Sequence, residues 1–423
     1  MSAYSALAEK IDHLALTDSH EHVRLQPATP AEAGLWGVLA SAYVYVSFHL
    51  AGAPSDHFAT RPDTPEQEWG KFAPYLEAVA TTSYFRGAWE GLRRALDVPD
   101  APLDRDLYVE LDARLRAAQA RPGWGKQLLQ ETAKIDRALL DAFWDPTCLD
   151  CDRDLFSPVL RVNGFVMCPW EGDRDHNDTS FWTCQDLLGV TVSDFAGFLE
   201  LYDAALDRHC RGGAKAIKLA LAYDRTLEFQ RVDRADAAQI WAAGPQAATL
   251  EQRLALGDYL TYYAVGRAVE RGLAVQIHTG ILEGLRPYAP PRTSPLLLAP
   301  LLQAHPQGRF DLFHAGFPYA RELATMAMGT PQVWADLCWV PLISDAAAGR
   351  ILDEWIDMLP GSKLLWGGDC ANPVAALGAS LAGRQVVAKT LAGKVDAGTM
   401  TRPQADRLAE MILRGNGREV FRL

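Results

Sequence analysis

The chain has 423 residues, of which 49% are apolar, 22% charged and 9% aromatic. This composition excludes an intrinsically disordered protein, because such chains lack the apolar residues needed to build a core. Lys and Arg number 41 against 53 for Asp and Glu, so the net charge is −12 and a phosphate backbone or an anionic bilayer would be repelled. We therefore expect neither nucleic acid nor a membrane as a partner.

The beginning of the chain and its cysteines indicate a cytoplasmic protein. The first residues contain no basic segment followed by an apolar one, which a secretory signal would require. The seven cysteines are odd in number and offer no second pair to join the Cys148-x-x-Cys151 motif in a zinc ribbon. We interpret them as reduced thiols.

One stretch of the chain has the length and apolar character of a membrane span. Residues 35–53 contain no Asp, Glu, Lys or Arg and are about long enough to cross a bilayer as a helix. Serine, histidine and glycine dilute the stretch, however, and the preceding Thr29-Pro30-Ala31-Glu32 matches a capping box with proline at the first helical position. We therefore predict a buried helix of a globular fold here.

Short apolar runs recur along the chain and are separated by segments with helical spacing. Leu260, Ala264, Val265 and Val269, for example, follow the three-and-four spacing of an amphipathic helix. Strands that alternate with such helices pair in parallel, and eight of these units predict a closed (β/α)8 barrel of the TIM type. The predicted strands are residues 14–18, 138–143, 160–168, 216–222, 274–278, 310–314, 333–339 and 363–368.

A long interval without a strand separates the first two runs. Large apolar residues recur in it at helical intervals, and Pro- and Asp-rich breaks at residues 54–65 and 97–106 divide it into separate helices. These residues include Trp69, Phe72, Leu76, Tyr84, Trp89 and Leu92. We predict that residues 1–22 hold the first barrel strand, residues 23–134 a large helical insertion, and residues 135–423 the remainder of the barrel.

The strongest local motif is Asp18-Ser19-His20-Glu21-His22, directly after the first apolar run. His20 and His22 are two residues apart in extended chain, so their imidazoles project to the same side and can reach one metal ion. By itself such a pair also fits a solvated loop.

Further candidates occupy the ends of other predicted strands. His278 closes the fifth run, His314 closes the sixth, and Asp369 directly follows the eighth. The active sites of such barrels form at the carboxyl ends of the strands, so these residues and the histidine pair are expected at one rim. Hydrogen-bonded core histidines and an N-capping aspartate are the alternative for each residue taken alone.

Lys218 lies inside the fourth run, where strand alternation places it on the face opposite the leucines. That face is expected to be the barrel lumen. A buried ammonium needs a compensating partner, for which a metal-bridging carbamate or a substrate carboxylate would serve. The alternative is a lysine that reaches the rim or pairs with a nearby aspartate.

The arrangement of Asp-x-His-x-His on strand one, Lys on strand four, His on strands five and six and Asp on strand eight resembles the amidohydrolase superfamily of metal-dependent barrels. The segments 313–322, 333–336, 365–369 and 412–421 are similar to the amidohydrolase-related branch. The helical insertion after strand one is also distantly similar to that of the uronate isomerases.

The resemblance implies a divalent metal, zinc or manganese, held by His20, His22, His278 and Asp369. One ion is expected, and two if Lys218 is carboxylated. Asp369 would accept a proton from a metal-activated water. His314 would bind a second ion or polarise the scissile carbonyl.

The implied activity is hydrolysis of an amide, lactone or related acyl bond. Non-oxidative decarboxylation and sugar-acid isomerisation, which use the same ligands, are the alternatives. The expected partner is a small-molecule substrate that carries a carboxylate, with Arg225 and Arg321 as candidates to bind it and a solvated surface as their alternative. The sequence is also compatible with a homo-oligomer.

Overall fold

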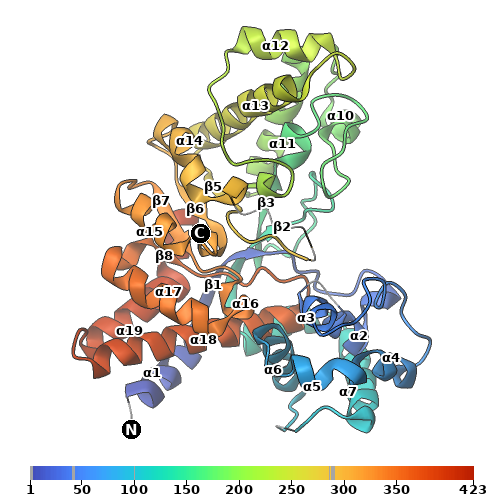
Figure 1. Cartoon of the computed structure of the whole chain (residues 1–423), viewed down its shortest axis with the longest axis vertical. Helices are drawn as coiled ribbons and strands as arrows, with labels where there is room; N and C mark the ends of the chain where they lie inside the picture. The colour runs from blue at the N-terminus through green and yellow to red at the C-terminus, as the bar shows by residue number, and fades with distance from the viewer. Residues whose placement is uncertain (1–2, 41–42, 100, 285, 287–290) are drawn as a thin grey trace.

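A single parallel sheet forms the centre of the protein in a computed structural model, which describes residues 3–40, 43–99, 101–284, 286 and 291–423. Its eight strands pair in the order of the sequence, each parallel to the next, which confirms the predicted (β/α)8 barrel (Figure 1). The strands are β1 (Leu16–Glu21), β2 (Ile135–Asp141), β3 (Phe156–Arg161), β4 (Ala216–Leu219), β5 (Ala274–Ile277), β6 (Phe310–Leu312), β7 (Val333–Asp336) and β8 (Leu364–Leu365).

Backbone hydrogen bonds join the last strand to the first. The amide of Ser19 donates to the carbonyl of Trp366 at 3.2 Å, and the amide of Asp369 donates to the carbonyl of His20 at 2.8 Å. The barrel is therefore closed at the end where the candidate residues lie. Each predicted run overlaps a strand. The third strand begins and ends earlier in the sequence than the predicted residues 160–168, because residues 163–166 form a helix.

The register of the strands places polar residues side by side inside the barrel. Arg161 on β3 is the register partner of Lys218 on β4, Lys218 that of Gln276 on β5, and Gln276 that of Asp311 on β6. All four side chains are buried. The upper layer of the lumen is thus polar, which is the reverse of an ordinary barrel core of branched apolar side chains.

Helices surround the strands. The N-terminal helix α1 (Ala3–Asp12) packs against the long α18 (Pro373–Asp396). The helices α11 (Phe195–Arg211), α12 (Arg234–Ala243) and α13 (Leu250–Glu270) form the green and yellow upper part of Figure 1. The helices after β2 are α9 (Asn163–Val166), α10 (Gln185–Leu188), α11 (Phe195–Arg211), α12 (Arg234–Ala243), α13 (Leu250–Glu270), α14 (Ala299–Ala304), α15 (Ala320–Met328), α16 (Val340–Ile343), α17 (Asp345–Met358), α18, α19 (Arg402–Glu410) and α20 (Asn416–Phe421).

The described residues between β1 and β2 form helices and no strand. They make the blue and cyan lobe at the lower right of Figure 1, beside the barrel. The helices are α2 (Gly34–Leu39), α3 (Val44–Leu50), α4 (Pro65–Phe72), α5 (Leu76–Val79), α6 (Ser83–Leu96), α7 (Arg105–Gln119) and α8 (Trp124–Gln127).

Close packing of α6 on α18 holds this lobe to the barrel. A Cβ atom on Gly91 would lie 2.3 Å from the carbonyl oxygen of Val374, and one on Gly378 would lie 2.2 Å from that of Gly87. Only residues without a side chain allow the two helix backbones to approach so closely. The lobe is therefore packed directly against α18.

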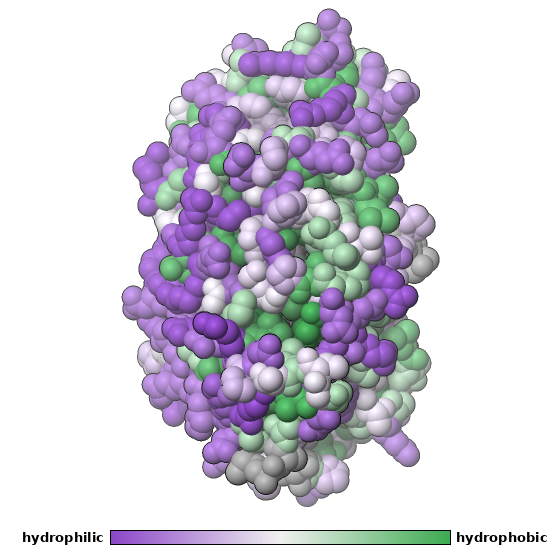
Figure 2. Space-filling view, turned by 90° about the vertical axis from the view of Figure 1, so that its left-hand side faces the viewer, coloured by the Kyte–Doolittle hydropathy of each residue, from purple (hydrophilic) through white to green (hydrophobic). Residues whose placement is uncertain are grey.

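The apolar stretch at residues 35–53 forms two short helices, α2 and α3, rather than one, and residues 41–42 between them lie outside the described part. Ahead of them, the Thr29 hydroxyl and the Ala28 amide both donate to the carboxylate of Glu32, which begins a short turn. No helix in the described ranges is both long enough and apolar enough to cross a membrane. The face shown in Figure 2 is mostly hydrophilic, with apolar side chains gathered near its middle.

Candidate metal centre

The sequence-predicted histidines and Asp369 converge at the carboxyl end of the barrel. His20 and His22 lie at the end of β1, His278 follows β5, His314 follows β6 and Asp369 follows β8. His314 and Asp369 have φ angles of 62° and 58°, a left-handed conformation that costs free energy for residues with a side chain. Strain of this kind collects at functional sites, where the surrounding fold maintains it.

Asp369 is the centre of the cluster. Its Oδ1 atom lies 3.2 Å from Nε2 of His22 and 3.7 Å from Nε2 of His20. Its Oδ2 atom lies 3.8 Å from Nε2 of His314. The two oxygens of one carboxylate therefore face His20 and His22 on one side and His314 on the other.

A hydrogen-bond acceptor fixes the outer nitrogen of each imidazole, and an acceptor there requires that this nitrogen carry the proton. The inner nitrogen is then left with a lone pair directed into the site, as in histidines that bind metal ions. The outer contacts are His20 Nδ1 to Gln276 Oε1 at 3.3 Å, His22 Nδ1 to the Asp141 carbonyl at 2.7 Å, His278 Nε2 to the Ile281 carbonyl at 2.7 Å, and His314 Nδ1 to the Cys338 carbonyl at 3.1 Å.

Without a cation these inner lone pairs conflict. Nδ1 of His278 lies 3.0 Å from Nε2 of His314, and neither nitrogen carries a proton in the tautomers that the carbonyl groups impose. Nε2 of His22 likewise faces a carboxylate oxygen of Asp369. A divalent cation among these atoms would remove the repulsion, so the donor set fits a metal ion such as zinc or manganese.

The pKa values of these groups favour the metal-binding protonation states. Burial lowers the pKa of His314 to about 4 and lowers the pKa values of His20 and His278 well below their ordinary value. Burial alone would raise the pKa of Asp369, but His22 and the other imidazoles around the carboxylate hold it well below its usual range. The imidazoles of His20, His278 and His314 are thus neutral and the Asp369 carboxylate is ionised at neutral pH.

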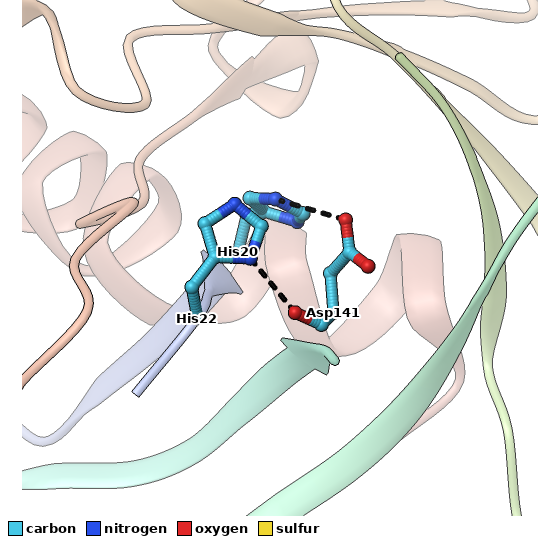
Figure 3. Close-up of side chains that lie close together, drawn as sticks. All are labelled: His20, His22 and Asp141. Atoms are coloured by element: carbon cyan, nitrogen blue, oxygen red, sulfur yellow. Dashed lines mark hydrogen bonds and ion pairs between the residues drawn. The ribbon is translucent and has the colours of Figure 1, made fainter. Parts of the chain in front are cut away.

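Asp141, at the end of β2, is a member of the cluster that sequence reasoning missed. Figure 3 shows it facing the two imidazoles of β1, and its Oδ2 atom lies 3.8 Å from Nε2 of His20. Burial would raise the pKa of this carboxyl, but Arg161, at 2.7 Å, lowers it. The signal was present in the sequence, because Asp141 lies within the second apolar run, near its end.

Lys218 extends into the lumen as predicted. Its ammonium group lies 3.5 Å from Nε2 of His20 and 3.7 Å from the centre of the Phe313 ring. Within the part of the chain that the structure describes, it forms no ion pair. Burial lowers the pKa of Lys218 to about 8. The carboxylates of Asp369 and Asp141 are near enough to interact with this ammonium electrostatically, but neither forms an ion pair with it, so it is able to bind a further anion or polarised oxygen.

A cavity of about 230 Å³ opens onto the metal-binding cluster. Its lining includes His22, Arg161, Lys218, His278 and Asp369, together with Tyr43, Phe143, His176, Asn177, Tyr223, Glu283, Arg286 and Ala371. A second cavity of about 160 Å³ shares His22, Phe143 and Ala371 with the first and extends towards the helical lobe. The chain thus has room for a small molecule next to the cluster.

Arg225 and Arg321 do not lie in this cavity, contrary to their expected role in binding substrate. Arg225 is buried against Asp258, to which Nη2 donates at 2.5 Å, and its other donors bind backbone carbonyls. Arg321 is 76% exposed and pairs with Glu354 on the surface. The cations that line the cavity are Arg161, Lys218 and Arg286 instead.

Two buried pairs of acids lie against the cluster. Burial raises the pKa of Asp18 to about 7 and that of its neighbour Glu21 well above the ordinary value. In the second pair, burial raises the pKa of Asp336 to about 6 and that of Asp311 well above its ordinary value. Oxygen atoms of Asp18, Glu21 and Asp311 have no hydrogen-bond partner except the acid beside them, so each pair retains a shared proton.

Comparisons with known proteins agree with the architecture. Residues 192–423 match the family described as Amidohydrolase. Protein fluG of Emericella nidulans is 31% identical over 151 residues, which is 35% of this chain and 17% of that protein.

The fold is similar to those of solved structures of low sequence identity. A uronate isomerase from Thermotoga maritima is 15% identical with a TM-score of 0.81, covering 99% of this chain and 97% of that one. A glucuronate isomerase from Caulobacter crescentus is 15% identical with a TM-score of 0.77, covering 99% and 94%. A protein from Lactobacillus casei described as a metal-dependent hydrolase is 15% identical with a TM-score of 0.66, covering 98% and 97%. The family match extends over more than half of the chain, so this protein belongs to the amidohydrolase family.

Proposed function

We propose that the protein is a metal-dependent hydrolase that cleaves an amide, lactone or related acyl bond in a small molecule. The observation that carries the proposal is the set of imidazole lone pairs directed at both oxygens of Asp369. His20, His22, His278 and Asp369 would hold the ion, for which zinc or manganese is the expected element. A divalent ion held there supplies Lewis-acid polarisation of a water molecule or of a substrate oxygen.

Asp369 is the proposed proton acceptor. It remains ionised because the surrounding imidazoles keep its pKa well below the usual range, and it borders the cavity. A water molecule at this carboxylate would give up its proton to Asp369 as its oxygen attacks the acyl carbon.

The tautomer of His314 supports a ligand role rather than a role in polarising the carbonyl. Its Nδ1–H donates to the Cys338 carbonyl, so Nε2 has no proton to offer a substrate oxygen. Lys218 is the better candidate for that role. Its ammonium lines the cavity and would donate to an oxygen on which negative charge develops in the transition state.

The cavity supports a substrate that carries a carboxylate. Arg286 lies over the Tyr223 ring at 4.9 Å and is exposed, whereas Arg161 is committed to Asp141. A guanidinium at the opening and an ammonium at the base offer two positions for an anionic group. Two proteins of similar fold are named as uronate and glucuronate isomerases, so uronates belong among the compounds to be tested.

The test starts from purified protein that has been stripped of metal and reloaded with zinc or manganese. N-acyl amino acids, lactones, aromatic carboxylates and uronates are incubated with it in water enriched in heavy oxygen. We expect acyl cleavage, with one solvent oxygen in the carboxylate product. Release of carbon dioxide from an aromatic acid, or conversion of a uronate from aldose to ketose, without acyl cleavage of any compound would overturn the proposal in favour of a decarboxylase or an isomerase.

A further inference from the structure

His176 borders the cavity outside the metal-binding cluster, in the loop between α9 and α10. Its Nδ1 atom lies 2.8 Å from Oδ2 of Asp224, and its backbone amide donates to Oδ1 of the same carboxylate at 3.1 Å. Both side chains are only 9% exposed. The imidazole is therefore held by one carboxylate through two separate contacts.

Other residues hold Asp224 in turn. Asn163, at the start of α9, donates from Nδ2 to Oδ2 of Asp224 at 2.8 Å, while its Oδ1 accepts from the amide of Ala220 at 2.8 Å. Asp224 follows β4 and Asn163 follows β3, so the pair is attached to two neighbouring barrel strands. Attachment of this kind preorganises a side chain better than a free loop does.

The ring of His176 also has a fixed orientation. It stacks on Tyr223 with a distance of 4.7 Å between ring centres and an angle of 17°, and Tyr223 meets the ring of His278 at 4.6 Å. Tyr223 thus separates His176 from the metal-binding histidines, while all three residues line the same cavity. The imidazole of His176 therefore borders the cavity without being part of the metal-binding cluster.

The carboxylate determines which nitrogen exchanges protons. Nδ1–H donates to Asp224, so Nε2 is the position that gains or loses a proton. Nε2 lies 3.1 Å from the side-chain amide of Asn177, a group that can donate to the neutral ring or, turned over, accept from the protonated one. Among the described residues, the charged side chains that line the same cavity are Arg161, Lys218, Glu283, Arg286 and Asp369.

We propose that His176, oriented by Asp224, is the general acid that protonates the leaving group. The inference rests on the proposed hydrolysis. Asp369 takes one proton from water while the water oxygen bonds to the acyl carbon. As the bond from that carbon to the leaving nitrogen or oxygen breaks, its electron pair takes the proton from Nε2 of His176. Transfer of the proton on Asp369 to solvent and uptake of a proton from solvent by His176 restore both groups.

The positions of Asp369 and His176 support their separate roles as proton acceptor and proton donor. Asp369 is surrounded by imidazoles that would hold a metal ion, so the proton from water would be taken up within the candidate metal centre. His176 lies beyond Tyr223 in the same cavity, where the departing group of a bound substrate would extend. A histidine that acts as a general acid must be protonated, and a carboxylate hydrogen-bonded to its other nitrogen stabilises that protonated form.

The experiment compares two probes that share the butyryl group and differ in the leaving group, N-butyrylglycine and 4-nitrophenyl butyrate. The amine of the first cannot leave without a proton, whereas nitrophenolate leaves unaided. For His176→Gln and for Asp224→Asn we expect kcat/KM to fall by at least about 10²-fold for N-butyrylglycine and to stay within about threefold for the ester. The matched control is His305→Gln, a half-buried histidine at the end of α14 and outside the cavity, which should change neither rate.

Each outcome decides between the two proposals. Equal losses on both probes, or no loss on either, would overturn the role of His176 and leave the hydrolase assignment intact. If the metal-loaded wild-type protein cleaves neither probe nor any compound of the wider panel, the hydrolase assignment fails and the role of His176 with it. Full ester activity in a variant also serves as the check that it has folded.

Discussion

Nε2 of His314 lies 3.0 Å from Nδ1 of His278, although a backbone carbonyl accepts the proton at the far side of each ring. Two lone pairs therefore face one another in a buried site. Relief of this repulsion requires either a proton, which the lowered pKa values of both rings oppose, or a cation. The stability of the protein should accordingly depend on metal.

We expect zinc or manganese to stabilise the metal-free protein. A ligand that binds only the folded chain adds about 2.7 kcal/mol to the free energy of unfolding when its concentration is 100 times Kd. The measurement is urea unfolding of chelator-treated protein with and without added ion. In His314→Asn the gain should be smaller, whereas His305→Gln should behave as wild type. An equal gain in both variants would mean that the ion binds elsewhere.

His20→Ala and His22→Ala should lose bound metal and keep the fold. Each substitution removes one inner nitrogen, while the core of the barrel lies below its catalytic rim. We expect metal content, measured by elemental analysis after dialysis, to fall at least about tenfold. Loss of a residue that only hydrogen-bonds a metal ligand already lowers metal affinity by about tenfold or more, and loss of the ligand itself should lower it further. The far-ultraviolet circular dichroism should be unchanged. Retention of a full metal complement would show that the pair on β1 is not the ligand pair.

The ends of the strands were the most informative feature of the sequence. Because parallel strands of a barrel end at one rim, locating the apolar runs was enough to bring His20, His278 and Asp369 together. The same rule would have found Asp141, which was overlooked because it lies within its run instead of after it. The third strand was predicted too far along the chain, because the mostly apolar residues 162–168 follow directly on the end of the strand and form a helix and a loop.

The cations that line the cavity could not be predicted in the same way. Arg225 is held by Asp258, which is 33 residues later in the sequence and packs against it only in the folded chain. His176 lies in a loop whose course is fixed by Asp224 and Asn163. No periodicity of the sequence records such loop contacts, so they depend on the tertiary structure.

Lys218→Met separates two roles for the lysine. If the ammonium polarises a substrate oxygen, its removal should lower kcat by about 10²- to 10³-fold, as the loss of one preorganised donor does. Metal affinity should be equal or higher, because a positive charge 3.5 Å from Nε2 of His20 is removed. Loss of metal together with activity would instead indicate that a carboxylated Lys218 is a bridging ligand. Isothermal titration with zinc and steady-state kinetics provide the two readouts.

Asp311→Asn should change how stability depends on pH. Burial and the neighbouring Asp336 raise the pKa of Asp311 well above its ordinary value of 3.8. At pH values between the ordinary pKa and the raised pKa, the folded chain therefore binds more protons than the unfolded chain. Its contribution to stability is therefore present below the ordinary pKa and is lost as pH rises through the folded pKa. The amide of the variant can donate to Asp336 at every pH.

The free energy of unfolding of Asp311→Asn minus that of wild type should thus increase from about pH 5 to about pH 8, because only wild type loses this contribution to stability. Urea unfolding of metal-free protein at both pH values measures this difference. Asp178→Asn is the control, because Asp178 is 93% exposed and its substitution should give the same difference at both pH values. A pH-independent difference for Asp311→Asn would mean that the carboxyl is already ionised in the folded protein.

Asp369→Asn should reduce turnover much more than it reduces metal binding. The amide oxygen can still face the imidazole side of the site, but an amide cannot accept the proton of the attacking water. We expect kcat to fall by about 10²- to 10⁴-fold, the range for loss of a general base, with a much smaller fall in metal content. Steady-state rates and elemental analysis of the same preparation measure both quantities.

The pH profile identifies the step that the substitution affects. Asp369 is ionised far below neutrality, so in wild type the acidic limb of kcat/KM should reflect protonation of this carboxylate within its cluster of imidazoles. In Asp369→Asn that limb should disappear, while any basic limb remains. Asp178→Asn again serves as the control and should keep the wild-type profile. Near-normal turnover with an unchanged profile in Asp369→Asn would remove this carboxylate from the chemistry, and the water would then need another proton acceptor, for which Asp141, 3.8 Å from Nε2 of His20, is a candidate.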